Sequence, residues 1–342
     1  MATDVRGCAE RAVPKAAPSF LFTLYYMKTP GSGRPLTLSG KFHYSDAGAA
    51  ARVVALAAPD GIATGPAPAV SAPHIPSGSV QSVHSVFFEP AGTGAFVATP
   101  ATAGPWSAQA QHGGPPSALA ARALELHEPD QSQRLARVAV DILRPVPLGK
   151  ITVRTRTVRP GRRVAMLEAV LEADDQEVMH ARGWRIAIPD VQVPAVVTGS
   201  APPPIPDERP LPGFRGAHHG GYLEAMDFRF VAGDGFATPG PAVVWGRPKI
   251  PLIPDEELSP MCRALLIADS GSGVSATLDP LDFLFINVDL TVVLPRDPAG
   301  EWLLLDAVTT IGAKGTGLAE TTLSDAGGPC GTALQTLLVA SR

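Results

Sequence analysis

The predicted helices and strands occur in the same order twice along the chain, and this repeat limits the fold more than any other feature. In the first copy, a hairpin (85–98) and a helix (112–126) precede four strand-like runs, at 137–143, 151–158, 164–171 and 178–186. In the second copy, strands near 228 and at 243–248 and a helix (260–269) precede runs at 283–294, 303–311, 318–323 and 332–339. Antiparallel strands with one apolar face can wrap such a helix. We therefore expect an α+β protein with two antiparallel sheets, each wrapping a long central helix.

Local residue patterns support these elements. Pro115 and Pro116 stand in the first turn of the first helix, where proline is well tolerated. Val138, Val140 and Ile142 lie on one face of the following strand because side chains alternate along a strand. The two copies also share a short motif, Val140-Asp141-Ile142 in one and Val288-Asp289-Leu290 in the other. The shared order and the shared letters favour a duplication.

The composition divides the chain into four segments. Residues 1–78 are rich in Pro, Gly and Ala and lack clear periodicity, so they bury too little apolar surface to offset their ordering entropy. We expect them to form a disordered N-terminal extension. Residues 191–212 have the Pro-rich composition of a stiff linker. This linker separates an N-terminal unit (79–190) from a C-terminal unit (213–342).

Charge, cysteine content and hydropathy exclude several classes of protein. The 28 basic and 32 acidic residues give a net charge of -4 and form no dense basic stretch, which argues against a nucleic-acid partner. Cys8, Cys262 and Cys330 are odd in number and lack metal-ligand spacing, as expected for reduced thiols in the cytoplasm. The apolar run at 20–27 is far shorter than the ~20 residues that cross a bilayer, so no membrane span is expected.

Three motifs of other enzyme and binding sites fail on inspection. The sequence contains no Gly-x-Ser-x-Gly, which argues against a nucleophile-elbow hydrolase. Residues 312–317 superficially resemble a phosphate loop, but they lie between two predicted strands and lead into no helix, so we expect a hairpin turn. His218 and His219 are adjacent and have no further spaced ligands, so we predict no metal site.

The most distinctive letters lie around the second helix and in the final strands. They are Trp245-Gly246-Arg247, Ala268-Asp269-Ser270-Gly271-Ser272-Gly273, Phe285-Ile286-Asn287-Val288-Asp289-Leu290-Thr291, Gly317-Leu318-Ala319-Glu320 and Ala333-Leu334-Gln335-Thr336-Leu337-Leu338-Val339. Together these segments resemble the acyl-CoA thioesterase II and thioesterase-like superfamily, in particular its actinobacterial members, over roughly residues 83–342. The resemblance implies a double hotdog fold, in which the two sheets join into one extended sheet.

The resemblance also implies a set of catalytic residues. In that family, an Asp on the second hotdog helix, a hydroxyl or amide residue on the next strand and a Gln on the last strand hold and activate the attacking water. By position these resemble Asp269, Asn287 and Gln335. Thr or Ser is usual where this chain has Asn287, although an amide can also orient water. The implied reaction is cofactor-free hydrolysis of acyl-CoA thioesters in lipid metabolism, by a protein that can associate into a homo-oligomer.

The same residues also have structural interpretations. Asp269 could be a capping carboxylate, but a negative charge is disfavoured at a helix C-terminus, which favours a functional role. Gln335 could be an ordinary outward-facing residue of an alternating strand, and Asn287 could simply support Asp289 on the same strand face.

Four residues are predicted to bind the substrate. Gly113 and Gly114 lack a Cβ and would let a thioester approach the first helix closely. Backbone N–H groups at a helix N-terminus could receive the oxyanion. His112 precedes them and could contact the ligand, although the His-Gly-Gly sequence also serves as a helix entry. Trp245 is predicted to contact the substrate, although such a tryptophan more often belongs to the core or lines a groove without a specific contact.

Two other functions remain open from the sequence. A hotdog enoyl-CoA hydratase or dehydratase would use an Asp/His pair, for which Asp175 and His180 are the candidates. A non-catalytic acyl-CoA-binding module would keep the groove without turnover, and Asn287 keeps that alternative open.

Overall fold

The computed structural model describes residues 21–24, 38–41, 85–195, 199–210, 220–233, 235–236 and 238–342. The chain forms two separate units, Met1–Ser77 and Gly78–Arg342. In the first, β1 (Leu21–Leu24) pairs antiparallel with β2 (Leu38–Lys41), a hairpin that the sequence pattern did not predict. The other residues of the 1–78 segment lie outside the described residues, so their predicted disorder stays a prediction.

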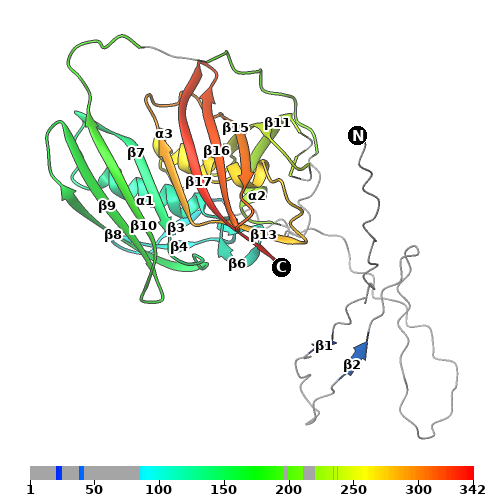
Figure 1. Cartoon of the computed structure of the whole chain (residues 1–342). Coiled ribbons are helices and arrows are strands. Elements are labelled where there is room, and N and C mark those ends of the chain that lie inside the picture. The colour runs from blue at the N-terminus through cyan, green and yellow to red at the C-terminus, as the bar shows by residue number, and fades with distance from the viewer. Residues whose placement is uncertain are drawn as a thin grey trace, which may run out of the picture. The chain divides into compact units, whose positions relative to one another are not determined.

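The N-terminal half of the second unit (residues 85–187) contains the first helix and its strands (Figure 1). Thr99 caps the short 3₁₀ helix η1 by accepting a hydrogen bond from the Ala101 amide. The elements are β3 (Phe88–Pro90), β4 (Ala95–Ala98), η1 (Pro100–Thr102), β5 (Ala103–Gly104), β6 (Ser107–Gln111), α1 (Gly114–Leu126), β7 (Gln133–Ile142), β8 (Gly149–Arg159), β9 (Val164–Ala173) and β10 (Gln176–Ala187). The predicted hairpin, helix and four strands are all present, while β5, β6 and η1 were not predicted.

The C-terminal half (residues 220–342) repeats this order. Its elements are α2 (Tyr222–Ala225), β11 (Met226–Ala232), β12 (Ala242–Pro248), α3 (Pro260–Ala268), α4 (Gly271–Val274), β13 (Phe283–Asn287), β14 (Asp289–Val293), β15 (Leu303–Ile311), β16 (Thr316–Asp325) and β17 (Gly328–Ser341). Residues 312–315 form the predicted turn between β15 and β16, with Gly315 at φ +81°. The predicted run at 283–294 is interrupted at Val288, because β13 and β14 pair with two successive stretches of β17.

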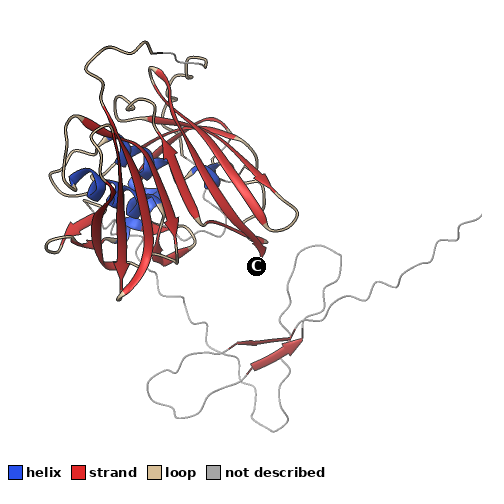
Figure 2. Cartoon of the chain, turned by 60° about the vertical axis from the view of Figure 1, so that its left-hand side comes forward, coloured by secondary structure: helices blue, strands red, loops and turns tan. Residues whose placement is uncertain are grey.

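A single antiparallel sheet of 13 strands connects the two halves. Its main path runs β11-β12-β15-β16-β17-β14-β7-β10-β9-β8-β4-β3, and β13 pairs with β17 off this path. The halves join where β14 pairs with β7, with Leu290 opposite Val140 in the register. Figure 2 shows the sheet curving around the helices, which lie on its inner side. The predicted α+β class and the extended sheet are therefore present.

The core of this unit lies between the sheet and the two long helices. Helices α1 and α3 run antiparallel and in close contact. Near the start of α1, Gly114 lies against the Leu266 carbonyl, and one turn further along, the Cys262 Sγ donates to the Ala118 carbonyl at 3.4 Å. Leu119 and Leu265 are fully buried, and burying each such side chain contributes ~1.5–3 kcal/mol. This packing fixes the start of α1 beside the end of α3.

The Pro-rich segment between the halves packs against the C-terminal half along residues 199–210. The Trp245 indole N–H donates to the Pro203 carbonyl at 3.2 Å, and Arg209 donates to the Phe230 and Gly233 carbonyls. The segment is therefore held in place at several points. Within the part of the chain that the structure describes, no helix is long and apolar enough to cross a membrane.

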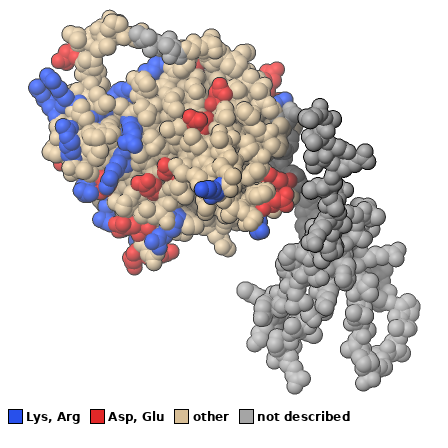
Figure 3. All heavy atoms as spheres, viewed as in Figure 1, with Lys and Arg blue, Asp and Glu red and all other residues tan. Residues whose placement is uncertain are grey.

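Basic side chains gather over the strands of the N-terminal half (Figure 3). Arg156 and Arg182 both bind Glu168, and Arg154 pairs with Glu172. Although burial opposes it, hydrogen bonding to these arginines lowers the pKa of Glu168. These three arginines thus belong to a ladder of alternating charges.

Candidate active site

A cavity of about 490 Å³ lies where the start of α1 meets the end of α3. Residues of both halves line it, and most of the lining is apolar. The lining includes Trp106, His112, Gly113, Ile142, Arg144, Leu223, Phe236, Asp269, Ser270, Ser272, Leu284, Phe285, Asn287 and Arg342. The volume falls within the ~300–1,000 Å³ typical of small-molecule sites. The cavity thus combines an apolar chamber with a small group of polar side chains.

Asp269 is placed at this cavity by the end of α3. The helix begins at the Ser259 cap, whose hydroxyl accepts the Cys262 amide at 3.2 Å, and it ends at Ala268. Asp269 follows as the C-terminal cap, and its side chain is 3 % exposed. A carboxylate at a helix C-terminus is electrostatically unfavourable unless donors compensate it. The hydrogen-bond donors around Asp269 therefore decide whether its carboxylate can be kept there.

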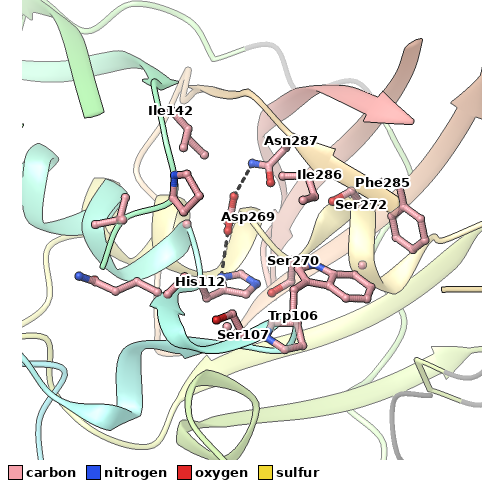
Figure 4. Close-up of a pocket in the computed structure, with 18 of the residues that line it drawn as sticks. Trp106, Ser107, His112, Ile142, Asp269, Ser270, Ser272, Phe285, Ile286 and Asn287 are labelled. Atoms are coloured by element: carbon pink, nitrogen blue, oxygen red, sulfur yellow. Dashed lines mark hydrogen bonds and ion pairs between the residues drawn. The ribbon is translucent and has the colours of Figure 1, made fainter. Parts of the chain in front are cut away.

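Three side chains hold the Asp269 carboxyl group, and Figure 4 shows two of them, Asn287 and His112. Asn287 Nδ2 donates to Oδ1 at 2.8 Å, and Gln335 Nε2 reaches the same oxygen at 3.3 Å. His112 Nδ1 lies 2.9 Å from Oδ2. The structure therefore brings Asp269, Asn287 and Gln335 together, as the sequence predicted, and adds His112 from the other half.

Gln335 fixes the turn that carries Asp269. It is 1 % exposed on β17, its Nε2 donates to the Asp269 carbonyl at 3.1 Å, and its Oε1 accepts the Ser272 amide at 2.9 Å. Gly271 makes this contact possible, since a Cβ there would lie 2.6 Å from Thr321 Oγ1 and 3.1 Å from Gln335 Oε1. Gln335 is not among the residues that line the cavity, so it supports Asp269 from behind.

Asn287 lines the cavity directly and has a fixed amide orientation. Its Nδ2 donates both to Asp269 Oδ1 and, at 3.3 Å, to the Asp289 carbonyl. Because the two N–H groups are used in this way, the amide oxygen is the acceptor left for a ligand or water. Among the described residues no donor to that oxygen is found.

The glycines at the start of α1 allow the two helices to approach each other. A Cβ on Gly113 would lie 2.8 Å from Asp269 Oδ2, and one on Gly114 would lie 2.4 Å from the Leu266 carbonyl oxygen. The prediction that both glycines make room for a thioester is therefore corrected: the carboxylate of Asp269 and the backbone of α3 fill that space. Gly113 nevertheless lines the cavity, whereas Gly114 does not.

Backbone donors are scarce at this helix start. Pro115 and Pro116 carry no N–H, and the Gly114 N–H points to His112 Nδ1 at 3.2 Å. Among the described residues the Gly113 N–H has no protein acceptor, and Gly113 lines the cavity, so this N–H is available beside the carboxylate.

Several aromatic residues that were not assigned to the site from the sequence form its walls. Trp106 meets Phe285 edge to face at 5.5 Å between ring centroids, and the Arg342 guanidinium lies 5.4 Å from the Trp106 ring centroid. Trp106 follows Pro105 in the loop between β5 and β6, short strands that the sequence pattern did not reveal. Tyr222, also unassigned, does not line the cavity but stacks on the His112 ring.

Some predicted residues lie elsewhere. Trp245 is 1 % exposed in β12 and bonds to Pro203, and it does not line the cavity, so the expected substrate contact has no geometric support. Asp175 lies in the turn between β9 and β10, and His180 bonds to Glu177 at 2.9 Å. Neither residue lines the cavity, so the pair considered for a hydratase is absent from it. Among the described residues no cluster of three or more His, Cys, Asp or Glu side chains forms a metal site.

Family models match both halves of the chain. The acyl-CoA thioesterase N-terminal domain matches residues 102–186, and the acyl-CoA thioesterase C-terminal domain matches residues 200–339. The chain belongs to the acyl-CoA thioesterase family. It is a thioester hydrolase by this membership, and the two matched domains include the cavity residues from both halves except Arg342.

Solved structures share the fold of this thioesterase at low sequence identity. A Thermobifida fusca protein described as a thioesterase II has a TM-score of 0.59 and 17% identity, covering 75% of this chain and 96% of its own. A TesB protein of Mycobacterium avium subspecies paratuberculosis has a TM-score of 0.53 and 21% identity, and the match covers 75% of this chain and 97% of that protein. A hotdog-fold protein of Alicyclobacillus acidocaldarius has a TM-score of 0.56 and 16% identity, and the match covers 72% of this chain and 93% of that protein. The fold is therefore of the hotdog type. No curated protein matches the sequence significantly.

Proposed function

We propose that this thioesterase hydrolyses acyl-CoA to the free acid and CoA, with the attacking water held by Asp269 and Asn287. One observation carries the proposal: a nearly buried carboxyl group, bonded by side chains from both halves, forms part of the wall of a largely apolar cavity. Hydrolysis needs a base, an acceptor that orients water, and a dry place for the acyl chain. The cavity combines all three.

The water in this proposal lies between two acceptors. Asp269 Oδ1 already receives Asn287 and Gln335, so Oδ2 is the oxygen that takes a proton from water. The Asn287 amide oxygen accepts the second water hydrogen. The water oxygen attacks the thioester carbonyl carbon, and one of its protons passes to Asp269. When the tetrahedral intermediate collapses, the C–S bond breaks and the thiolate of CoA takes up that proton.

The start of α1 supplies the oxyanion donor. The thioester oxygen gains negative charge as the water adds, and a backbone N–H near a helix N-terminus stabilises such charge. We assign this role to the Gly113 N–H, because Gly113 lines the cavity, whereas Gly114 does not, and Pro115 and Pro116 carry no N–H. His112 holds Asp269 Oδ2 from the same side and forms part of the wall against which the thioester lies.

The rest of the cavity suits the two ends of an acyl-CoA. Ile142, Trp106 and Phe285 offer apolar surface to the acyl chain, and Arg144 and Arg342 add positive charge to the lining, which suits the anionic phosphates of CoA. In this proposal residues 79–190 and 213–342 are the two hotdog units of a double hotdog, joined by 191–212. The buried thiols of Cys262 and Cys330 suit the reducing cytoplasm.

Release of CoA thiol from short-chain acyl-CoA and palmitoyl-CoA tests the proposal. The wild-type protein should release thiol, and Asp269→Asn should release it far more slowly, while Glu125→Gln, a carboxyl change at the other end of the helix pair, should retain activity. Water addition to crotonyl-CoA without thiol release would replace the proposal with a hydratase. Tight acyl-CoA binding with neither reaction would indicate a non-catalytic binding module.

A further inference from the structure

Tyr222 is a fully buried aromatic residue that touches both halves of the site. It begins α2, directly after Gly220 and Gly221, which adopt φ angles of +98° and +71°. A Cβ on Gly221 would lie 2.4 Å from the Ala103 carbonyl oxygen, so only glycine fits this turn without displacement. The glycine pair thus turns the chain after the linker and directs Tyr222 into the space beside His112.

The Tyr222 ring lies flat against the imidazole of His112. The ring centroids are 3.7 Å apart and the planes differ by 8°. Each imidazole nitrogen makes its hydrogen bond in the ring plane, so the plane decides where Nδ1 points. Nδ1 has two competing neighbours, Asp269 Oδ2 at 2.9 Å and the Gly114 amide at 3.2 Å. A tilt of the ring would therefore change which neighbour Nδ1 meets.

The Tyr222 hydroxyl fixes the ring to the helix that carries Asp269. It donates to the Leu266 carbonyl in the last turn of α3 at 2.7 Å and lies 3.0 Å from Ser270 Oγ. Because its hydrogen is used on the carbonyl, the Tyr222 oxygen accepts from Ser270. Burial, with the nearby charge of Asp269 as a smaller cause, raises the pKa of Tyr222 well above its ordinary value, so the hydroxyl stays a donor.

We propose that Tyr222 is a positioning residue of this site, whose ring keeps the His112 imidazole in the plane that aims Nδ1 at the Asp269 carboxylate. The proposal rests on the proposed role of Asp269 in hydrolysis. Tyr222 does not line the cavity and does not touch the substrate. It acts through its ring, which stacks on His112, so that the donor and the carboxylate keep their geometry.

Kinetics of two Tyr222 variants in the full chain test this role. Tyr222→Leu removes the aromatic stack and should lower kcat by about 10- to 100-fold with little change in KM, the scale expected for a misplaced catalytic group. Tyr222→Phe keeps the stack and should retain most of kcat, even if its stability falls. In a His112→Ala background, Tyr222→Leu should cause little further loss. An equal loss in that background, or equal losses for Phe and Leu, would overturn the proposal.

Nuclear magnetic resonance of the His112 ring supplies a readout that does not require turnover. The wild type and Tyr222→Phe should show the signal of a hydrogen-bonded Nδ1, which is assigned by its absence in His112→Ala. Tyr222→Leu should lose this signal, while its circular dichroism shows that it remains folded. A retained signal in Tyr222→Leu would contradict the positioning role. If the wild type released no CoA thiol at all, the proposed function would fail, yet this spectrum would still decide whether Tyr222 orients His112.

Discussion

The antiparallel helices α1 and α3 meet at two junctions, and only one of them has the features of an active site. At the first, the start of α1 meets the end of α3, and Asp269 is held by Asn287 and His112 beside the 490 Å³ cavity. At the second, the end of α1 meets the start of α3, and Glu125 Oε1 accepts the Ser259 hydroxyl at 2.9 Å. Both junctions therefore place a carboxyl group between the helices.

The second junction is closed by its own hydrogen bonds. Arg185 donates to the carbonyls at the end of α1, including those of Glu125 and His127, and the Ser259 hydroxyl caps α3. A smaller cavity of about 270 Å³ adjoins it and is lined largely by polar residues such as Asp130 and Gln133. At the first junction, by contrast, the Gly113 amide and the Asn287 oxygen remain available. A carboxyl group is therefore a candidate base where neighbouring donors and acceptors have no protein partner and can bind substrate.

The largest expected difference between the junctions concerns activity. Asp269→Asn removes the base and should lower kcat for thiol release by about 10²–10⁴-fold, the usual contribution of a general base. Glu125→Gln changes a carboxyl group of the same helix pair and should leave kcat close to that of the wild type. Steady-state assays of both variants, each checked for folding by thermal unfolding, make the comparison. Equal losses in the two variants would remove the distinction between the junctions.

Asn287 tests whether the open acceptor of the first junction matters. Asn287→Ala removes both the donor to Asp269 Oδ1 and the oxygen proposed to orient water, so kcat should fall by about 10²-fold. Asn287→Thr restores an oxygen that can accept and donate, and it should recover part of the loss. Values of kcat for the two variants with one acyl-CoA provide the measurement. An alanine variant as active as the wild type would exclude Asn287 from water positioning.

Much of the fold could be predicted from the sequence because its signals are local. Pro115 and Pro116 in the first turn mark α1, and the alternation of Val138, Val140 and Ile142 marks β7. The interruption at Val288 was missed, because an alternating apolar run does not encode where one strand must pair with two stretches of β17. The strands β5 and β6 are too short to show a period.

The site was predictable only in part, because its geometry comes from long-range contacts. The resemblance to the thioesterase family indicated Asp269, Asn287 and Gln335, and the structure places these side chains in contact. The sequence suggested that Gly113 leaves space, but not that Asp269 fills that space. The position of Trp245 could not be predicted from the local sequence, because its indole N–H bonds to Pro203 in the linker.

Ser259 at the closed junction should affect stability and not catalysis. Ser259→Ala removes the cap of α3 and the donor to Glu125, so the free energy of unfolding should fall by about 1 kcal/mol, with kcat unchanged. Urea unfolding with a parallel thiol-release assay measures both quantities. A clear loss of kcat without a loss of stability would show that the second junction takes part in catalysis.

The smallest expected effect is the pH dependence of stability at Glu125. Burial raises the pKa of this carboxyl group above 4.5, although hydrogen bonds from Ser259 and Cys262 oppose the rise. The folded protein therefore holds this proton to a higher pH than the unfolded chain, so the contribution of Glu125 to stability is complete below about pH 4.5 and is lost as pH rises through the folded pKa. Glu125→Gln stays neutral and keeps an acceptor for Ser259, so its stability relative to the wild type should increase with pH. Urea unfolding of both proteins at pH 4 and pH 8 measures this difference, and a stability gap that is the same at both pH values would mean that folding does not raise the pKa of Glu125.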